Sequence, residues 1–215
     1  MKFSLTDYRE VRKFFIIFYV VGTIGMVLPL TQALFIRLIP YSLLLNIAYL
    51  GYFHADKKSL KTVLAFIGIA VLSFFIEMIG VESGLIFGTY AYGEGLGLKW
   101  HDTPLIIGVN WVILVYCSSA ILEQYTRWKT TFKILAASTL MLLYDVVLEI
   151  AAPKMDMWVF NHEEVPMANY VAWFVIAALF HTVIKLLKIN IKNPLALTVF
   201  ACQFVFFILL AMLLK

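Results

Sequence analysis

Three carboxyl side chains lie within long apolar runs of this sequence, where ionisable groups are rare. Glu77 comes near the end of one run, and Asp145 and Glu149 come near the end of another. Residues four positions apart share one face of a helix, so Asp145 and Glu149 are expected to point the same way. In a low-dielectric interior, beside other carboxyls, at least one such group keeps its proton near neutral pH. It can then donate that proton where water is scarce.

The composition indicates the solvent around these groups. Of the 215 residues, 63% are hydrophobic and 14% are charged, which is far outside the range of soluble domains. A soluble protein of this size could not hide so much hydrocarbon, so the chain is expected to lie in lipid. The net charge of +4 is then a matter of orientation in the membrane, and the chain has no basic face for nucleic acid.

The apolar runs predict an all-α integral membrane protein, a seven-transmembrane-helix bundle forming a single polytopic domain over residues 1–215. A spanning helix needs about 20 mostly apolar residues. The expected spans are 14–36, with a kink at Pro29, then 40–54, 62–80, 104–124, 131–152, 167–187 and 194–214.

Lysine and arginine alternate strongly between the connections of these spans. Thirteen of them belong to the N-terminus and every second connection, and four belong to the other side. Because basic residues stay inside, the N-terminus is expected in the cytoplasm and the C-terminus outside, in the cell (inner) membrane. The long polar connections 81–103 and 153–166 then both face outward.

Counting about 1.5 Å per helical residue brings the polar groups to one depth in the outer third of the membrane. The carboxyls are joined at this level by Asn110, Trp111, Asn169 and Trp173. Ionisable residues within a span usually face a polar interior, so we expect a site where these helices converge. The alternative is that the carboxyls only join helices by hydrogen bonds or reach interfacial water.

The connections supply further aromatic candidates. Tyr90 and Tyr92 belong to the stretch 77–111, which holds seven of the eleven glycines, and Trp158 lies in the second outer connection. Aromatic residues at this level are also typical of the membrane interface belt. The sequence has no helix-seven lysine for a retinal, no His-rich or Cys-rich metal cluster and no hydrolase motif.

These residues also form two spaced signatures. The first is Glu77-x-x-Gly80-x-x-Ser83-Gly84-x-x-Phe87-Gly88-x-Tyr90-x-Tyr92-x-x-x-Leu96-Gly97, followed by Pro104 and Trp111. The second is Asp145-x-x-x-Glu149, then Trp158-x-Phe160, then Val165-Pro166-x-x-Asn169-x-x-x-Trp173. Together they resemble the carotenoid biosynthesis protein family of membrane hydratases, the CruF type, over about residues 60–190.

The resemblance implies addition of water across the terminal double bond of an acyclic carotenoid end, giving a tertiary alcohol. It implies no cofactor, a linear or monocyclic carotenoid from the bilayer as substrate, and other carotenoid-pathway enzymes as partners. Our hypothesis is that Asp145 or Glu149, and after them Glu77, protonates the alkene, and that a second carboxylate accepts the proton of water. Trp111, Trp173 and Tyr90 would hold the cation, and Asn110 and Asn169 would orient water.

Two alternatives remain open from the sequence. An acid-catalysed end-group cyclase needs the same proton and the same cation stabilisation, and differs only in what captures the cation. A proton-coupled transporter or lipid-binding membrane protein would use the carboxyls as proton carriers. The sequence shows no inverted repeat, and its carboxyls cluster at one depth, which disfavours a transport path.

Overall fold

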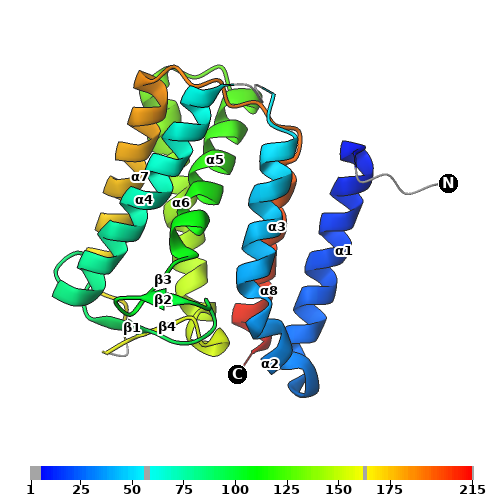
Figure 1. The fold of residues 1–215 in the computed structure, drawn as a ribbon, viewed down its shortest axis with the longest axis vertical. Coiled ribbons are helices and arrows are strands. Elements are labelled where there is room, and N and C mark those ends of the chain that lie inside the picture. Colours follow the sequence, from blue (N-terminus) through cyan, green and yellow to red (C-terminus); the bar gives the residue numbers. More distant parts are fainter. Residues whose placement is uncertain (1–5, 56–58, 162–163, 215) are drawn as a thin grey trace.

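The computed structural model describes residues 6–55, 59–161 and 164–214, which form eight α-helices, one short 3-10 helix and four short strands (Figure 1). The helices are α1 (Tyr8–Val27), α2 (Pro29–Arg37), α3 (Ile39–Tyr52), α4 (Leu60–Ser83), α5 (Ile107–Tyr125), α6 (Thr130–Ala151), α7 (Met167–Leu186) and α8 (Ala196–Leu213). The strands are β1 (Tyr90–Tyr92), β2 (Lys99–Trp100), β3 (Thr103–Pro104) and β4 (Trp158–Phe160), and η1 covers Pro153–Met155.

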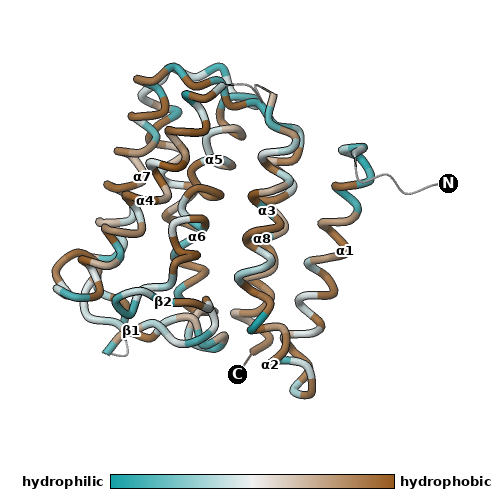
Figure 2. The backbone as a smooth tube through the Cα atoms, viewed as in Figure 1, coloured by the Kyte–Doolittle hydropathy of each residue, from teal (hydrophilic) through white to brown (hydrophobic). Residues whose placement is uncertain are grey.

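Within the described residues, α4, α5, α6, α7 and α8 are each long and apolar enough to cross a membrane. The bent pair α2 and α3, with an angle of 53° between them, counts as a sixth candidate if it forms one broken span. Figure 2 shows hydrophobic colour along the helices and hydrophilic colour concentrated in the connections at both ends. The chain is therefore an all-α, multi-pass membrane protein.

The first expected span, 14–36, is not one helix. α1 ends at Val27, Leu28 is extended with φ −78° and ψ 118°, and α2 begins at Pro29. Proline lacks an N–H and its ring clashes with the preceding turn, and it pushes the residue before it towards extended backbone. Pro29 therefore ends the helix where we expected only a kink, and the chain turns back through α2 into α3.

The central helix of the bundle is α5. Every residue from Asn110 to Ala120 is buried, and α5 packs against α3, α4, α6, α7 and α8. α1 packs along α8, and α7 packs along α6. A helix that is buried all round must carry any polar group towards a partner or a cavity, because lipid and water are both excluded. Two consecutive residues of α5, Asn110 and Trp111, do this in different directions.

The four strands lie together at one end of the bundle, which we call the strand end (Figure 1). The connections α3–α4, α5–α6 and α7–α8 lie at the opposite end, on the same side as the start of α1 (Figure 1). β1 pairs antiparallel with β4, and β2 pairs antiparallel with β3. The β1–β4 pair joins residues that are 66–70 positions apart in sequence, and it covers the ends of α4 and α6.

The basic residues that predicted the orientation divide between these two ends, although Lys2, Lys57, Lys58 and Lys215 lie outside the described residues.

Candidate active site

Glu77 lies near the strand end of α4 and is 3% exposed. Its Oε2 accepts hydrogen bonds from the hydroxyls of Tyr90 (2.7 Å) and Tyr92 (2.9 Å). Its Oε1 accepts one from Nε1 of Trp111 (2.9 Å). A buried carboxyl is costly unless its oxygens are satisfied, and here three neutral donors satisfy both of them.

The Tyr-x-Tyr spacing has a structural cause. Alternate residues of a strand share a face, so Tyr90 and Tyr92 both point inward towards Glu77 while Ala91 is exposed. Burial, followed by the nearby charge of Glu77, raises the pKa of both phenols well above their ordinary value. The phenols therefore stay protonated, as donors to the carboxyl, throughout the physiological range.

Two glycines let the chain return to Glu77. Gly84 ends α4 in the left-handed conformation with φ 66°, and its N–H donates to the carbonyl of Gly80. Gly88 has φ 95°, and a Cβ there would lie 2.6 Å from the ring of Pro166. Glycine adopts such backbone angles at little cost, and a side chain at position 88 would also push the two connections apart.

Asp145 and Glu149 face the same interior from α6, as their spacing predicted. Asn169 of α7 bridges them, because its Nδ2 donates to Oδ2 of Asp145 and to Oε1 of Glu149, each at 3.0 Å. Oε2 of Glu149 accepts from Nε1 of Trp158 at 2.8 Å. Five of the six carboxyl oxygens of the cluster thus accept a hydrogen bond. The sixth, Oδ1 of Asp145, is buried without a partner among the described residues.

Trp158 reaches Glu149 from β4 by the same alternation that orients the tyrosines. Trp158 and Phe160 face inward, while Val159 between them is 54% exposed. In the β1–β4 register Tyr92 pairs with Trp158, and Tyr90 pairs with Phe160. The paired strands therefore present four inward aromatic side chains over the carboxyls.

Trp111 and Trp173 complete the aromatic surroundings. Their rings stack with centroids 4.2 Å apart and an interplanar angle of 19°. Trp111 donates its N–H to Glu77, and because α5 packs against both α4 and α7, the stacked rings lie between these two helices. The carboxyls are thus surrounded by aromatic rings and neutral donors.

A small void, about 10 Å³ in volume, lies among these groups. Its lining comprises Glu77, Phe87, Tyr90, Tyr92, Ile107, Glu149, Trp158, Phe160, Asn169 and Trp173. A cavity of about 10–15 Å³ holds one water when it offers two to four polar partners. Two carboxyls, two hydroxyls and an amide supply such partners, so the void has the size and polarity of a single-water site.

The structure brings together nine of the ten residues expected at the site. These are Glu77, Tyr90, Tyr92, Trp111, Asp145, Glu149, Trp158, Asn169 and Trp173. Asn110 is the exception: it is buried at the same level but lines a different cavity. Phe87, Ile107 and Phe160 line the void without having been named as candidates. Phe87 and Phe160 belong to the two spaced signatures, which was the available signal for them.

The comparisons with known proteins identify the family of this chain. The family described as "Carotenoid biosynthesis protein" matches residues 14–215. Bisanhydrobacterioruberin hydratase of Haloarcula japonica is 29% identical over 117 residues, which make up 51% of this chain and 40% of that protein. No solved structure matches the chain. Since the family match covers nearly the whole length, the chain belongs to the carotenoid biosynthesis protein family.

Proposed function

We propose that this protein is a carotenoid hydratase. It adds water across the terminal double bond of an acyclic carotenoid end group and gives a tertiary alcohol, by acid catalysis with carboxyl residues and without a cofactor. The family supports the pathway, and the hydratase activity named for the Haloarcula japonica relative supports the reaction. The observation that carries the proposal is the single-water void between Glu77 and Glu149. Asn169, which also lines the void, hydrogen-bonds Asp145, whose Oδ1 has no partner among the described residues.

The proposal includes a topology of seven passes, in which α1 is the first and the broken pair α2–α3 is the second. Its support is the division of thirteen basic residues from four, together with the alternating directions of the long helices in Figure 1. The N-terminus is then cytoplasmic, the C-terminus is extracytoplasmic, and the strand end faces outward in the cell membrane. A carotenoid reaches the cluster sideways from the bilayer, and other enzymes of the pathway exchange substrates through the same lipid.

Asp145 is the proposed proton donor. A protonated carboxyl needs one oxygen free to carry the proton, and Oδ1 of Asp145 has no hydrogen-bond partner among the described residues. The proton passes to the less substituted carbon of the terminal alkene, and its π electrons form the new C–H bond. The positive charge then rests on the tertiary carbon, which is the more stable cation.

Aromatic faces stabilise this cation where water is scarce. Trp173, Trp158 and Tyr90 line the void, and Trp111 stacks on Trp173. A cation over such a ring gains about 2 kcal/mol when it is desolvated. No Lys or Arg side chain in the described ranges pairs with the three carboxyls, so the negative charge of the cluster also favours the cation.

Water in the void completes the reaction. Its oxygen forms the C–O bond, and Glu149 accepts the proton that it loses, as a general base. Asn169 holds Glu149 in place by the same amide that holds Asp145. One proton leaves Asp145 and one arrives at Glu149, so the pair ends with the proton count with which it began. The product is the alkene plus one water.

The test separates hydratase from cyclase and transporter. Purified protein in lipid vesicles is incubated with an acyclic carotenoid, and the product is analysed by mass spectrometry. A gain of one water per modified end supports the hydratase, and an isomer of unchanged mass would replace it by the cyclase. The void favours water as the nucleophile, because an enzyme that closes a ring must keep water away from the cation. Protein-dependent dissipation of a proton gradient, with no modified carotenoid, would replace the proposal by the transporter.

A further inference from the structure

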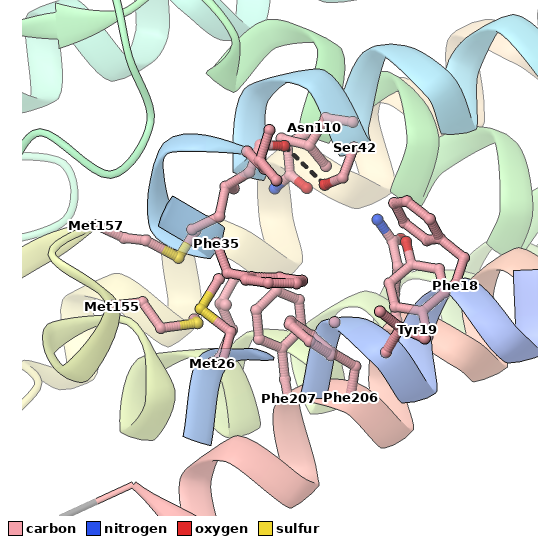
Figure 3. A pocket seen from close by; sticks show the side chains of 17 residues that line it. Phe18, Tyr19, Met26, Phe35, Ser42, Asn110, Met155, Met157, Phe206 and Phe207 are labelled. Atoms are coloured by element: carbon pink, nitrogen blue, oxygen red, sulfur yellow. Dashed lines mark hydrogen bonds between the residues drawn. The ribbon is translucent and has the colours of Figure 1, made fainter. Parts of the chain in front are cut away.

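The carboxyl cluster has room for one water, so an isoprenoid end must be held in a neighbouring space. A larger cavity, about 120 Å³, lies beside the cluster and is bounded by α1, α2, α3, α5, α6 and α8 and by the connection after α6 (Figure 3). Most of its lining is apolar and soft, including Phe18, Met26, Phe35, Met155, Met157 and Phe206. An apolar cavity of about 150 Å³ stays dry and binds benzene, so this one suits a terminal isoprenoid unit.

This cavity shares a wall with the carboxyl cluster. Three residues that line it are direct chain neighbours of three cluster residues: Asn110 precedes Trp111, Leu148 precedes Glu149, and Met157 precedes Trp158. Consecutive Cα atoms are about 3.8 Å apart. The cavity and the carboxyl cluster are therefore direct neighbours along α5, along α6 and at the start of β4.

Two residues give the cavity polar atoms without a hydrogen-bond partner among the described residues: Gln203, through its Oε1, and Asn110. The Asn110 side chain is 7% exposed, lines the cavity and makes no hydrogen bond to any residue in the described ranges. Figure 3 shows it at the edge of the cavity beside Ser42, whose hydroxyl donates to the carbonyl of Ile39. Nearly all buried amides are paired, so an unpaired one facing a cavity indicates a ligand with a polar group.

The cavity also has a route from lipid. Two of its lining residues, Val21 of α1 and Leu38 at the α2–α3 junction, are 50% and 42% exposed. Val21 lies about two helical turns before the break at Leu28, and Leu38 lies at the end of α2, the short helix that follows the break. A long polyene can therefore insert one end between α1 and α3 and leave the rest of its chain in the bilayer.

We infer that this cavity, the end-group chamber, binds the terminal isoprenoid unit of the polyene, and that the Asn110 amide hydrogen-bonds the tertiary hydroxyl of the product. The inference rests on the proposed function. The chamber supplies what the water-sized void lacks, which is space for the hydrocarbon end directly beside the carboxyl cluster. Methionine and phenylalanine side chains repack readily around an irregular apolar end.

A second apolar cavity is the natural competitor. It lies between α3, α4 and α5 and is lined by Gly51, His54, Thr62 and Tyr116 among others. Its lining runs from Thr62, fifteen positions or about 22 Å before Glu77 on α4, to Ala70, Val109 and Val112, so only its Thr62 end is remote from the carboxyls. It is larger, at about 390 Å³, but one of its lining residues, Val112, directly adjoins a cluster residue, against three for the first cavity.

The test compares one substitution in both cavities. Gly22 lines the chamber, and Gly51 lines the second cavity. A Cβ added at Gly22 would meet only the Phe206 ring, at 3.4 Å, and one added at Gly51 would meet nothing within 4 Å. Each glycine is changed to leucine, and retention of an acyclic carotenoid by the purified protein is measured from its visible absorption. The chamber predicts at least tenfold weaker binding for Gly22→Leu and unchanged binding for Gly51→Leu. Unchanged binding in Gly22→Leu, or equal loss in both, overturns the inference.

A second variant keeps the question open to test if Gly22→Leu does not fold. Asn110→Leu preserves volume and removes the amide, so it should bind the hydrocarbon normally and the hydroxylated product about fivefold more weakly. Equal affinity of Asn110→Leu and the unmodified protein for the product overturns the inference. Both assays measure binding without turnover. If the unmodified protein retains no carotenoid at all, the proposed function fails with it. If the unmodified protein retains carotenoid but binding is unchanged in the chamber variants, only the chamber inference fails.

Discussion

Carboxyls within helices occur at both ends of the bundle, buried at one end and partly exposed at the other, and their partners differ. At the strand end, Glu77, Asp145 and Glu149 are held by phenol, indole and amide donors without a cation among the described residues. At the opposite end, Glu123 forms ion pairs with Lys133 (2.8 Å) and with Lys185. Two lysines compensate the negative charge of Glu123, so this carboxylate is expected to stay ionised in its ion pairs. The strand-end carboxyls have no cation partner among the described residues, which leaves them free for the proton transfers of the proposed mechanism.

Buried polar residues other than carboxylates also differ between the two ends of the bundle. In the opposite half, His181 is buried between Ser119 (Nδ1, 2.8 Å) and Ser118 (Nε2, 3.3 Å), so both ring nitrogens have partners. Asn193 donates to the carbonyl of Leu50 and to the hydroxyl of Tyr116. These contacts join helices, which is the usual role of polar groups between packed helices. Polar groups at the opposite end thus join helices, whereas the strand end holds the carboxyls to which we assign the proposed chemistry.

The largest expected effect comes from removing the proposed acid. Asp145→Asn keeps the size of the side chain but cannot carry the transferred proton. General acid catalysis contributes about 100- to 10,000-fold, so product formation should fall by a factor in that range. The measurement is turnover in vesicles at matched amounts of folded protein. Activity within a factor of two of the unmodified protein would remove Asp145 from the mechanism.

A smaller effect is expected from Trp158→Phe, which removes the indole N–H that donates to Glu149 and keeps an aromatic face. Leaving a buried carboxylate oxygen unsatisfied costs about 1–3 kcal/mol, and 1.4 kcal/mol of lost transition-state stabilisation corresponds to about tenfold in rate. Turnover and the free energy of unfolding should therefore both decrease. Val159→Thr, on the exposed face of the same strand, serves as the control and should change stability by less than about 0.5 kcal/mol.

The phenol donors predict a pH dependence confined to alkaline solution. Because burial and Glu77 raise the pKa of Tyr90 and Tyr92, folding favours the protonated phenols. Their contribution to stability is complete below the ordinary phenol value of about 10 and is lost as the pH rises beyond it. Thermal unfolding across this range should show a decline that the Tyr90→Phe, Tyr92→Phe double variant reduces. An identical decline in both proteins would contradict the role assigned to the phenols.

The smallest effect is expected at the opposite end. Glu123→Gln removes a partly exposed carboxyl that pairs with two lysines, and such pairs contribute about 0–1 kcal/mol. Turnover should remain at the level of the unmodified protein, since Glu123 is far from the cluster along the bundle. A loss of turnover as large as that of Asp145→Asn would abolish the distinction between the two ends.

Depth along the membrane could be predicted from the sequence, because the rise per residue of a helix is fixed. This is why Glu77, Asp145, Glu149 and Asn169 were expected at one level and meet there. Rotation about the helix axis could not be predicted, because it depends on the neighbours that each face packs against. Successive helical residues point about 100° apart, so Trp111 faces Glu77 while Asn110 faces the end-group chamber.

The structure of the connections between the helices also could not be predicted from the sequence. Tyr-x-Tyr and Trp-x-Phe each show strand alternation, but the pairing of β1 with β4 depends on contacts between distant segments. Pro29 was expected to bend a span, and a sequence does not show whether the helix continues beyond its proline. In the structure Leu28 is extended and the helix stops, which opens the bundle beside the chamber.

Turnover in water labelled with both deuterium and oxygen-18 tests most directly the central claim that the strand-end carboxyls add water to a carotenoid end. The account predicts that each modified end gains one non-exchangeable deuterium on carbon and one oxygen-18 in the tertiary hydroxyl. The same labels should be absent with Asp145→Asn and present with Glu123→Gln. Product that carries neither label, or an equal yield of labelled product from Asp145→Asn, would contradict the account.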